Sequence, residues 1–215
     1  MYLEYLLKNK TGSDTINTDG GKGSGNFGHE GREGEVGGSA PSGGSDSNEP
    51  STKWKGEELN DTETRSIRRY TSGMNAALLN ESLRNGTELT AEQESLMEGL
   101  DSALDKAPTY SGTLKRSLQF MSDEGREKFL EAHKTGNTVE YSEFISTTKG
   151  SEDYNPDGEV QITIIDSTAG RDISFFNRDE NEVLYKRNSK FLVLGVSEPT
   201  EDGKPYRILL SEAEQ

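Results

Sequence analysis

The chain of 215 residues carries 39 acidic and 24 basic side chains, which gives a formal net charge of −15 at pH 7. A charge this negative argues against unaided binding to nucleic acid, because neutralising phosphates needs an excess of Lys and Arg. The lack of cysteine in the sequence excludes disulfides, thiolate metal sites and a cysteine nucleophile. Two histidines are too few for a histidine-rich metal centre, and no apolar run approaches the roughly 20 residues that span a bilayer.

The amino-terminal segment differs in composition from the rest of the chain. Residues 11–53 contain 12 glycines and only four apolar residues. Such a segment cannot bury enough surface to offset the entropy lost on ordering. We therefore predict a flexible Gly-rich tether over residues 1–55 and one folded domain over residues 56–215. Residues 1–7 lack the basic segment and the small-residue cleavage site of a signal peptide, so none is expected.

The first half of the predicted domain shows helical patterns. Apolar residues recur at helical spacing after Asp61 or Thr62, either of which can cap a helix. The residues on this face are Ile67, Tyr70, Met74, Ala77 and Leu78. Ser72-Gly73 predicts a break or bend, and Asn85-Gly86 predicts the end of the helical region.

A second helical pattern begins at Thr90, which is expected to form a capping box with Gln93. Its apolar face is made of Leu96, Leu100, Ala103, Leu104 and Ala107. A strand is then expected over residues 113–120, and Ser122 is expected to cap a short helix that ends at Gly136.

From residue 138 onward the pattern is mostly that of strands. Val139 and Tyr141 alternate with polar residues, as strand residues do when one face is buried. The further strands expected are 159–165, 182–185, 190–196 and 206–210. Asp202-Gly203 predicts a hairpin turn before the last of them. Helices followed by strands predict an α+β fold in which amino-terminal helices pack on two mainly antiparallel β-sheets.

An arginine interrupts the apolar face of the first predicted strand. Alternation places Leu114, Arg116, Leu118 and Phe120 on one face. A buried guanidinium needs an anionic partner, and its planar fork suits a phosphate or a carboxylate. Arg116 is therefore a candidate binding residue. The alternatives are an internal ion pair with a glutamate, or a strand end at which the side chain reaches water.

Two further polar groups stand beside apolar strand patterns. Ser146-Thr147-Thr148 follows Phe144-Ile145, and its hydroxyls can hydrogen-bond a ligand or a catalytic side chain. The alternative is a strand end that runs into a Lys149-Gly150 turn. Glu180 and Glu182 enter the strand at 182–185, and extended geometry would place both carboxylates on one face, roughly 6–7 Å apart. The alternative for this pair is a solvated acidic turn.

In chain order these features are an arginine on a strand, an aromatic–x–Ser-Thr-Thr strand and a Glu-x-Glu motif. This order resembles the mono-ADP-ribosyltransferase family of the arginine–serine–Glu-x-Glu class, of the toxin and phage type. The resemblance covers about residues 60–212. It implies an ADP-ribosyltransferase-like fold, NAD as co-substrate, no metal, release of nicotinamide and transfer of ADP-ribose to a target protein.

The resemblance also implies roles for individual residues. Glu182 would stabilise the positive charge that develops on the ribose, and Glu180 would orient or deprotonate an acceptor arginine. Ser146 would position Glu182 and nicotinamide, and Arg116 would contact an NAD phosphate. Ser117 stands where the family usually has a glycine whose backbone approaches nicotinamide.

Aromatic residues complete the implied site. Phe144 would pack under it as part of the NAD site, and Phe175 or Phe176 would contact the target protein in the substrate-recognition loop. Residues 21–32 resemble a Gly-rich segment of phage head-associated proteins, so a phage head or delivery component is an expected partner. The compartment stays open between the cytoplasm, delivery with a virion and secretion by a non-classical route. A plain linker is the alternative for this segment. An NAD glycohydrolase and a non-catalytic virion or interaction module remain alternative functions.

Overall fold

The computed structural model describes residues 54–150, 152–177, 180–199 and 205–214. The predicted tether up to residue 53 and the predicted Asp202-Gly203 turn lie outside these residues. The helices are α2 (Asp61–Thr71), α3 (Met74–Asn85), α4 (Ala91–Lys106) and α5 (Asp123–Ala132). No helix in the described part of the chain is both long and apolar enough to cross a bilayer.

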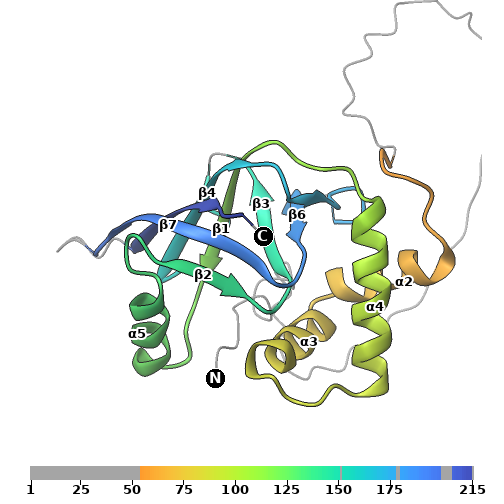
Figure 1. Cartoon of the computed structure of the whole chain (residues 1–215), viewed down its shortest axis with the longest axis horizontal. Coiled ribbons are helices and arrows are strands. Elements are labelled where there is room, and N and C mark those ends of the chain that lie inside the picture. Colours follow the sequence, from red (N-terminus) through yellow and green to blue (C-terminus); the bar gives the residue numbers. More distant parts are fainter. Residues whose placement is uncertain (1–53, 151, 178–179, 200–204, 215) are drawn as a thin grey trace, which may run out of the picture. The chain divides into compact units, whose positions relative to one another are not determined.

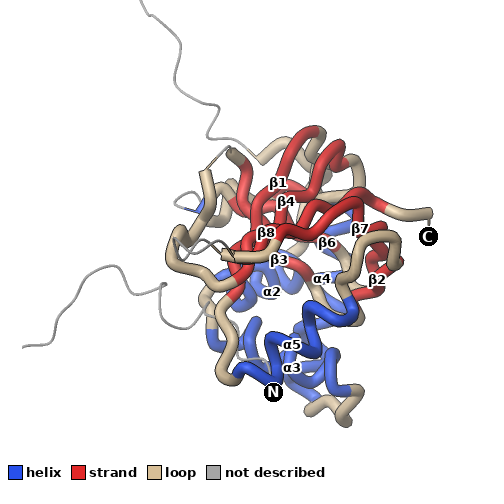
Figure 2. Tube along the Cα trace, turned by 90° about the vertical axis from the view of Figure 1, so that its left-hand side faces the viewer, coloured by secondary structure: helices blue, strands red, loops and turns tan. Residues whose placement is uncertain are grey.

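The strands follow the first three helices along the chain, with α5 inserted among them (Figure 1). They are β1 (Gly112–Leu118), β2 (Thr138–Tyr141), β3 (Ile145–Lys149), β4 (Val160–Ser167), β5 (Arg171–Asp172), β6 (Glu182–Tyr185), β7 (Ser189–Ser197) and β8 (Tyr206–Glu212). Figure 2 shows the strands gathered in the upper part of the view, with α3 and α5 below them.

The strands pair in the order β2-β7-β8-β4-β1-β3-β6-β5. Neighbouring strands are antiparallel except for the parallel pair β4 and β8. The predicted α+β fold is confirmed, but the two expected sheets are joined by continuous pairing into one eight-stranded sheet. The order places β3 between β1 and β6, so strands from distant parts of the chain become neighbours.

The first helical region consists of two helices. Asn60, rather than Asp61 or Thr62, caps α2 and forms a capping box with Glu63. The predicted break lies at Gly73, whose φ of 99° only glycine adopts easily, and α3 begins directly after it.

The break changes which residues of the second helix are buried. Met74 and Leu78 are 64% and 53% exposed, so the single apolar face predicted through them was wrong. The periodicity of α2 does not continue through Gly73, because α3 is a new helix with its own direction. Its buried residues are Ala76, Leu79 and Asn80.

Most other predicted elements are confirmed. Thr90 and Gln93 form the predicted capping box of α4, and the five apolar residues expected on that helical face are buried. Val139 and Tyr141 of β2 are buried as expected. Ser122 caps α5, which ends at Ala132, before the glycine expected to end it.

The apolar residues form two cores, one within the sheet and one between the sheet and the helices. Strand β6 lies between them, because all four of its residues are buried. Val183 and Tyr185 belong to the sheet core, whereas Leu184 packs with residues of α2 and α4. Since alternate residues share a face, Glu182 lies on the same face of β6 as Leu184.

A buried carboxylate joins α2 to α4. Glu63 is 2% exposed and accepts hydrogen bonds from Lys106 Nζ at 2.8 Å and from Ser102 Oγ at 2.6 Å. The backbone N–H of Asn60 also donates to it, at 2.8 Å. The bond from Lys106, followed by that from Ser102, lowers the pKa of Glu63 to about 2 against the opposing effect of burial.

We predict that Glu63→Gln lowers the free energy of unfolding at neutral pH by about 1–3 kcal/mol, because the hydrogen bonds to an ionised carboxylate are lost. A folded-state pKa below the ordinary value of 4.5 stabilises the fold above that pH, and this contribution is lost as the pH falls toward about 2. Urea unfolding at a series of pH values should therefore show the two proteins converging between pH 4.5 and 2. A difference that stays constant over this range would contradict the prediction.

Candidate active site

Three neighbouring strands bring Arg116, Ser146 and Glu182 together. Ser146 Oγ donates a hydrogen bond to Glu182 Oε1 at 2.5 Å. Arg116 Nη1 donates to the backbone oxygen of Ser146 at 2.6 Å. Arg116 and Glu182 are only 6% and 2% exposed, so a cation and an anion lie inside the fold around a single serine.

The electrostatic surroundings of Arg116 combine burial with nearby acidic groups. Burial lowers the pKa of Arg116, and the charges on Tyr141, Glu143 and Glu182 act in the opposite direction. Glu143 is itself 4% exposed and forms an ion pair with Arg84 of α3 at 3.2 Å. The guanidinium thus lies near two carboxylates, and its hydrogen bond to Ser146 is to a carbonyl oxygen.

Glu180 and Glu182 are brought together by a turn. Strand β6 begins at Glu182, and Asn181 has a φ of 47°, in the left-handed region that asparagine tolerates better than most residues. The extended geometry predicted for this pair was therefore wrong. Both carboxylates nevertheless meet at Asn177, whose Nδ2 donates to Glu180 Oε2 at 2.7 Å and to Glu182 Oε2 at 3.1 Å.

The loop over residues 152–159 supplies a further contact to the acidic pair. The hydroxyl of Tyr154 is hydrogen-bonded to Glu180. Burial, followed by the charge of Glu180, raises the pKa of Tyr154. Glu180 is therefore held from two loops, by Tyr154 and by Asn177.

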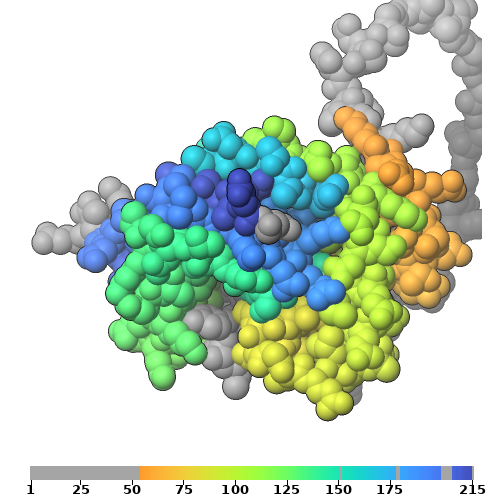
Figure 3. All heavy atoms as spheres, viewed as in Figure 1, coloured from red at the N-terminus to blue at the C-terminus, as the bar shows by residue number. Residues whose placement is uncertain are grey.

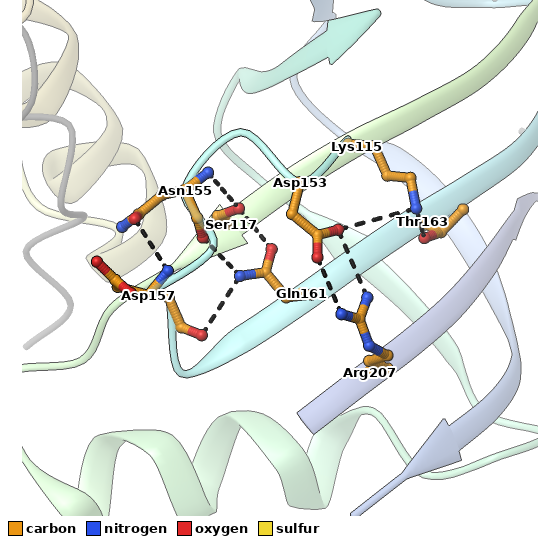
Figure 4. A network of polar contacts seen from close by, with 9 residues as sticks. Lys115, Ser117, Asp153, Asn155, Asp157, Gln161, Thr163 and Arg207 are labelled. Atoms are coloured by element: carbon orange, nitrogen blue, oxygen red, sulfur yellow. Dashed lines mark hydrogen bonds and ion pairs between the residues drawn. The ribbon is translucent and has the colours of Figure 1, made fainter. Parts of the chain in front are cut away.

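Ser117 fixes the position of that loop. Its Oγ accepts from the backbone N–H of Asn155 at 3.0 Å and donates to Gln161 Oε1 at 2.5 Å (Figure 4). Gln161 Nε2 in turn donates to the backbone oxygen of Asn155 at 2.6 Å. The Ser117 side chain thus holds the loop against β1 and β4.

Two cavities meet at Arg116. A small one of about 30 Å³ is also lined by Ser117, Ser146, Tyr154 and Glu180. A larger one of about 500 Å³ is lined by residues of α3, β1, α5 and β2. Figure 3 shows α5, in green, and α3, in yellow, on the same face of the molecule, and both helices contribute residues to the lining of this second cavity. Arg84 and Lys128 add positive charge to its wall, and Glu140 and Glu143 add negative charge.

The turn that follows β5 carries the two aromatic residues predicted to contact a target. Phe175 is 37% exposed, whereas Phe176 packs against the helix core. The ring of Trp54 lies 6.4 Å from that of Phe175 and 5.3 Å from that of Phe176. These three rings form an aromatic cluster beside the acidic pair.

Phe144 lies on the helix side of β3 and is fully buried. Its ring packs edge-on against Tyr70 at 5.9 Å, and its backbone N–H and carbonyl both bond to the amide of Asn80. Phe144 therefore packs in the helix core, two residues before Ser146 in the chain, and its side chain does not line either cavity. Asn80 also donates to the hydroxyl of Tyr70, at 3.0 Å.

In the described part of the chain, no group of three or more His, Asp or Glu side chains is placed to hold a metal ion. The chemistry available to this site is that of two carboxylates, a hydroxyl and a buried guanidinium. Such a set can bind an anionic ligand at the guanidinium and stabilise a positive charge at the carboxylates.

A family model described as ADP-ribosyltransferase exoenzyme matches residues 47–213. The chain belongs to the ADP-ribosyltransferase exoenzyme family. The resemblance found in the sequence is thereby confirmed at the level of the family.

Curated relatives agree with this family. The chain is 31% identical over 138 residues to the NAD(+)–protein-arginine ADP-ribosyltransferase Tre1 of Serratia proteamaculans, a match that covers 63% of this chain and 29% of that protein. It is 29% identical over 153 residues to secreted exoenzyme S of Pseudomonas aeruginosa, covering 69% of this chain and 32% of that protein. The chain thus spans about a third or less of the length of these relatives.

Solved structures of exoenzymes share the fold. Exoenzyme S of Pseudomonas aeruginosa, in complex with human 14-3-3 protein beta and bound to carba-NAD, superposes with a TM-score of 0.58 at 25% identity, over 72% of this chain and 75% of that one. The C3 exoenzyme of Clostridium limosum gives a TM-score of 0.60 at 18% identity, over 73% of this chain and 87% of that one.

Some residues of the exoenzyme site were not predicted from the sequence. Asn177, Tyr154 and Arg84 approach the predicted residues from loops and a helix distant from them in the chain. Tyr154 stands in a turn-rich segment that ends at Gly158, and Asn177 precedes the acidic run, but neither pattern indicates which side chain it will meet. Trp54 is the single tryptophan of the sequence and lies just before the predicted domain boundary at residue 56.

We predict that Ser117→Gly releases the 152–159 loop, because the N–H of Asn155 loses its acceptor. Hydrogen exchange at the Asn155 amide should become several-fold faster, as expected for the loss of one hydrogen bond. The amide of Val193, which donates to Asn137 at 2.9 Å in a distant part of the sheet, serves as the internal control. Equal acceleration at both amides would indicate general destabilisation and contradict a local lock.

Proposed function

We propose that this exoenzyme transfers ADP-ribose from NAD to an arginine side chain of a target protein and releases nicotinamide. The observation that carries the proposal is the constellation of Arg116, Ser146, Glu180 and Glu182, drawn from three neighbouring strands and one turn. The similarity to the NAD(+)–protein-arginine ADP-ribosyltransferase Tre1, and to the Mycobacterium avium protein named Putative NAD(+)–arginine ADP-ribosyltransferase Mav, supports it.

The reaction breaks the bond between the ribose C1′ and the nicotinamide nitrogen. The bonding electron pair leaves with nicotinamide, which becomes neutral, and positive charge develops on the ribose. A carboxylate close to the sugar stabilises this charge, as in glycoside hydrolysis. Glu182 is suited to this role because Ser146 and Asn177 hold its two oxygens in place.

The acceptor nitrogen then forms the new bond to C1′ and loses a proton. Glu180 is less buried than Glu182 and lines the small cavity, so it can face an incoming side chain. A carboxylate matches a guanidinium through paired hydrogen bonds and can take the released proton. This geometry favours arginine as the acceptor.

The NAD pyrophosphate needs positive charge, which the site supplies at its buried end. Arg116 lines both cavities, and Arg84 stands on the wall of the larger one. We therefore place the phosphates near Arg116, with Arg84 as a second cation. The Ser117 side chain is engaged with the 152–159 loop, so any contact that this residue makes with nicotinamide would come from its backbone.

The aromatic cluster of Trp54, Phe175 and Phe176 is proposed as the contact surface for the target protein. Phe175 is its exposed member in the turn after β5, and the turn ends at Asn177, beside the acidic pair. The expected association with a phage head or delivery component remains a prediction.

Glu182→Gln should reduce both nicotinamide release and arginine transfer by at least about 100-fold, because it removes the charge that stabilises the ribosyl cation. Glu180→Gln should reduce transfer by a similar factor and leave most of the NAD hydrolysis, because its role is confined to the acceptor. Both reactions can be followed with labelled NAD and a bacterial lysate, with Glu98→Gln on the exposed face of α4 as the matched control.

The outcomes separate the candidate functions. Protein labelling no higher than that of the Glu182→Gln variant would refute the transferase. Nicotinamide release without any labelled acceptor would indicate an NAD glycohydrolase, and no NAD binding would indicate a non-catalytic module. Equal loss of both reactions in Glu180→Gln would contradict the division of roles between the two glutamates.

A second prediction concerns target recognition. Phe175→Ala should lower transfer to proteins and leave transfer to a small guanidino acceptor such as agmatine unchanged, because the small acceptor does not reach the aromatic cluster. Leu209→Ala is the matched control, since Leu209 on β8 is also 37% exposed and lies outside the site. Parallel loss with both acceptors would show that Phe175 acts on the catalytic centre.

A further inference from the structure

Asn177 hydrogen-bonds both carboxylates of the acidic pair, Glu180 and Glu182. Its single amide nitrogen donates to Glu180 at 2.7 Å and to Glu182 at 3.1 Å. An asparagine amide has two N–H hydrogens, so one can serve each carboxylate. The residue therefore contacts both members of the acidic pair at once.

The backbone that carries Asn177 is anchored at the start of its turn and closed within it. Ile173 N–H donates to the backbone oxygen of Glu182 at 3.1 Å, and Phe176 N–H donates to Ile173 at 2.8 Å. At the start of the turn, Lys149 Nζ binds Asp172 Oδ2 at 3.0 Å and Ser174 Oγ at 2.8 Å. The amide is thus presented to the glutamates by a turn that is tied to β3 and β6.

A neutral donor suits this position for an electrostatic reason. Two carboxylates that meet at one point repel each other and favour protonation of one of them unless donors or cations compensate. A lysine or arginine here would neutralise the pair and weaken its attraction for a ribosyl cation and a guanidinium. An amide stabilises both ionised forms and leaves their negative charge available.

The other groups that face the pair do not replace this contact. Ser146 donates a hydrogen bond to Glu182. Tyr154 is hydrogen-bonded to Glu180 and interacts with Glu182 only through charge. Arg116 from β1 and Tyr70 from α2 act on Glu182 through their electrostatic interaction with it.

We propose that Asn177 is a positioning residue that holds Glu180 and Glu182 together in their ionised forms for the transfer reaction. This inference rests on the proposed transferase function and deepens it. Asn177 thereby couples Glu182, which stabilises the ribosyl cation, to Glu180, which faces the acceptor.

The test compares Asn177→Ala and Asn177→Asp with the unsubstituted chain. Asn137→Ala is the matched control, because it removes an asparagine amide that donates to the backbone oxygen of Ala132 at 3.0 Å and not to the acidic pair. Nicotinamide release and transfer to agmatine are measured over a range of pH, and thermal unfolding is measured for every variant.

Asn177→Ala should lower transfer by about 10–100-fold, as loss of a supporting hydrogen bond to a reactive group typically does. The acid limb of the activity profile should move to higher pH, because the ionised pair has lost a donor. Asn177→Asp should move it further, because a third carboxylate adds repulsion. Both variants should unfold at temperatures close to that of Asn137→Ala.

An Asn177→Ala protein whose rates and pH profile match those of the unsubstituted chain would overturn the inference. A loss of activity that follows only a loss of thermal stability would also overturn it, since the residue would then be structural. If the unsubstituted chain itself neither releases nicotinamide nor modifies agmatine, the proposed function fails instead, so the two failures are distinguishable.

Discussion

The hydrogen bond from Ser146 to Glu182 is the interaction on which the rest of the site depends. It fixes a carboxylate that is almost completely buried, where an ionised group is stable only with donors arranged around it. The serine can make this bond because β3 pairs with β6, and its own carbonyl receives Arg116 because β1 lies on the other side of β3. The pairing order of β1, β3 and β6 therefore brings Arg116, Ser146 and Glu182 together.

The two cores explain why these strands hold their positions. Strand β6 has apolar neighbours on both faces, so sliding it by one residue would place Glu182 in the sheet core and Val183 against the helices. Phe144 and Leu184 fasten the same region to α2 and α4. Packing against α2 and α4 thus helps to set the register in which the acidic residue meets the serine.

Strand alternation and capping residues were sufficient to predict most elements, because these signals are local. Chain order indicated Arg116, Ser146, Glu180 and Glu182 as candidate residues, and the structure brings them together, whereas their roles stay predictions. The single face through Met74 and Leu78 failed because Gly73 redirects the chain, and the extended Glu-x-Glu geometry failed because Asn181 adopts a left-handed conformation. Asn177 could not be predicted, because its contacts with Glu180 and Glu182 depend on the tertiary arrangement of loops around the sheet.

The two proposed substrates carry opposite charges, whereas the chain as a whole is strongly negative. A chain of −15 repels an anionic dinucleotide at long range, but at physiological ionic strength charges more than about 8 Å apart are largely screened. Binding of NAD must therefore rely on cations close to the site, which include Arg116 within the fold and Arg84 and Lys128 on the wall of the larger cavity. An acceptor arginine meets no such conflict, because its cationic side chain would be attracted at short range by the carboxylates of Glu180 and Glu182. The local arrangement of charges, and not the net charge of the chain, is thus what would let one site accept both an anionic dinucleotide and a cationic acceptor.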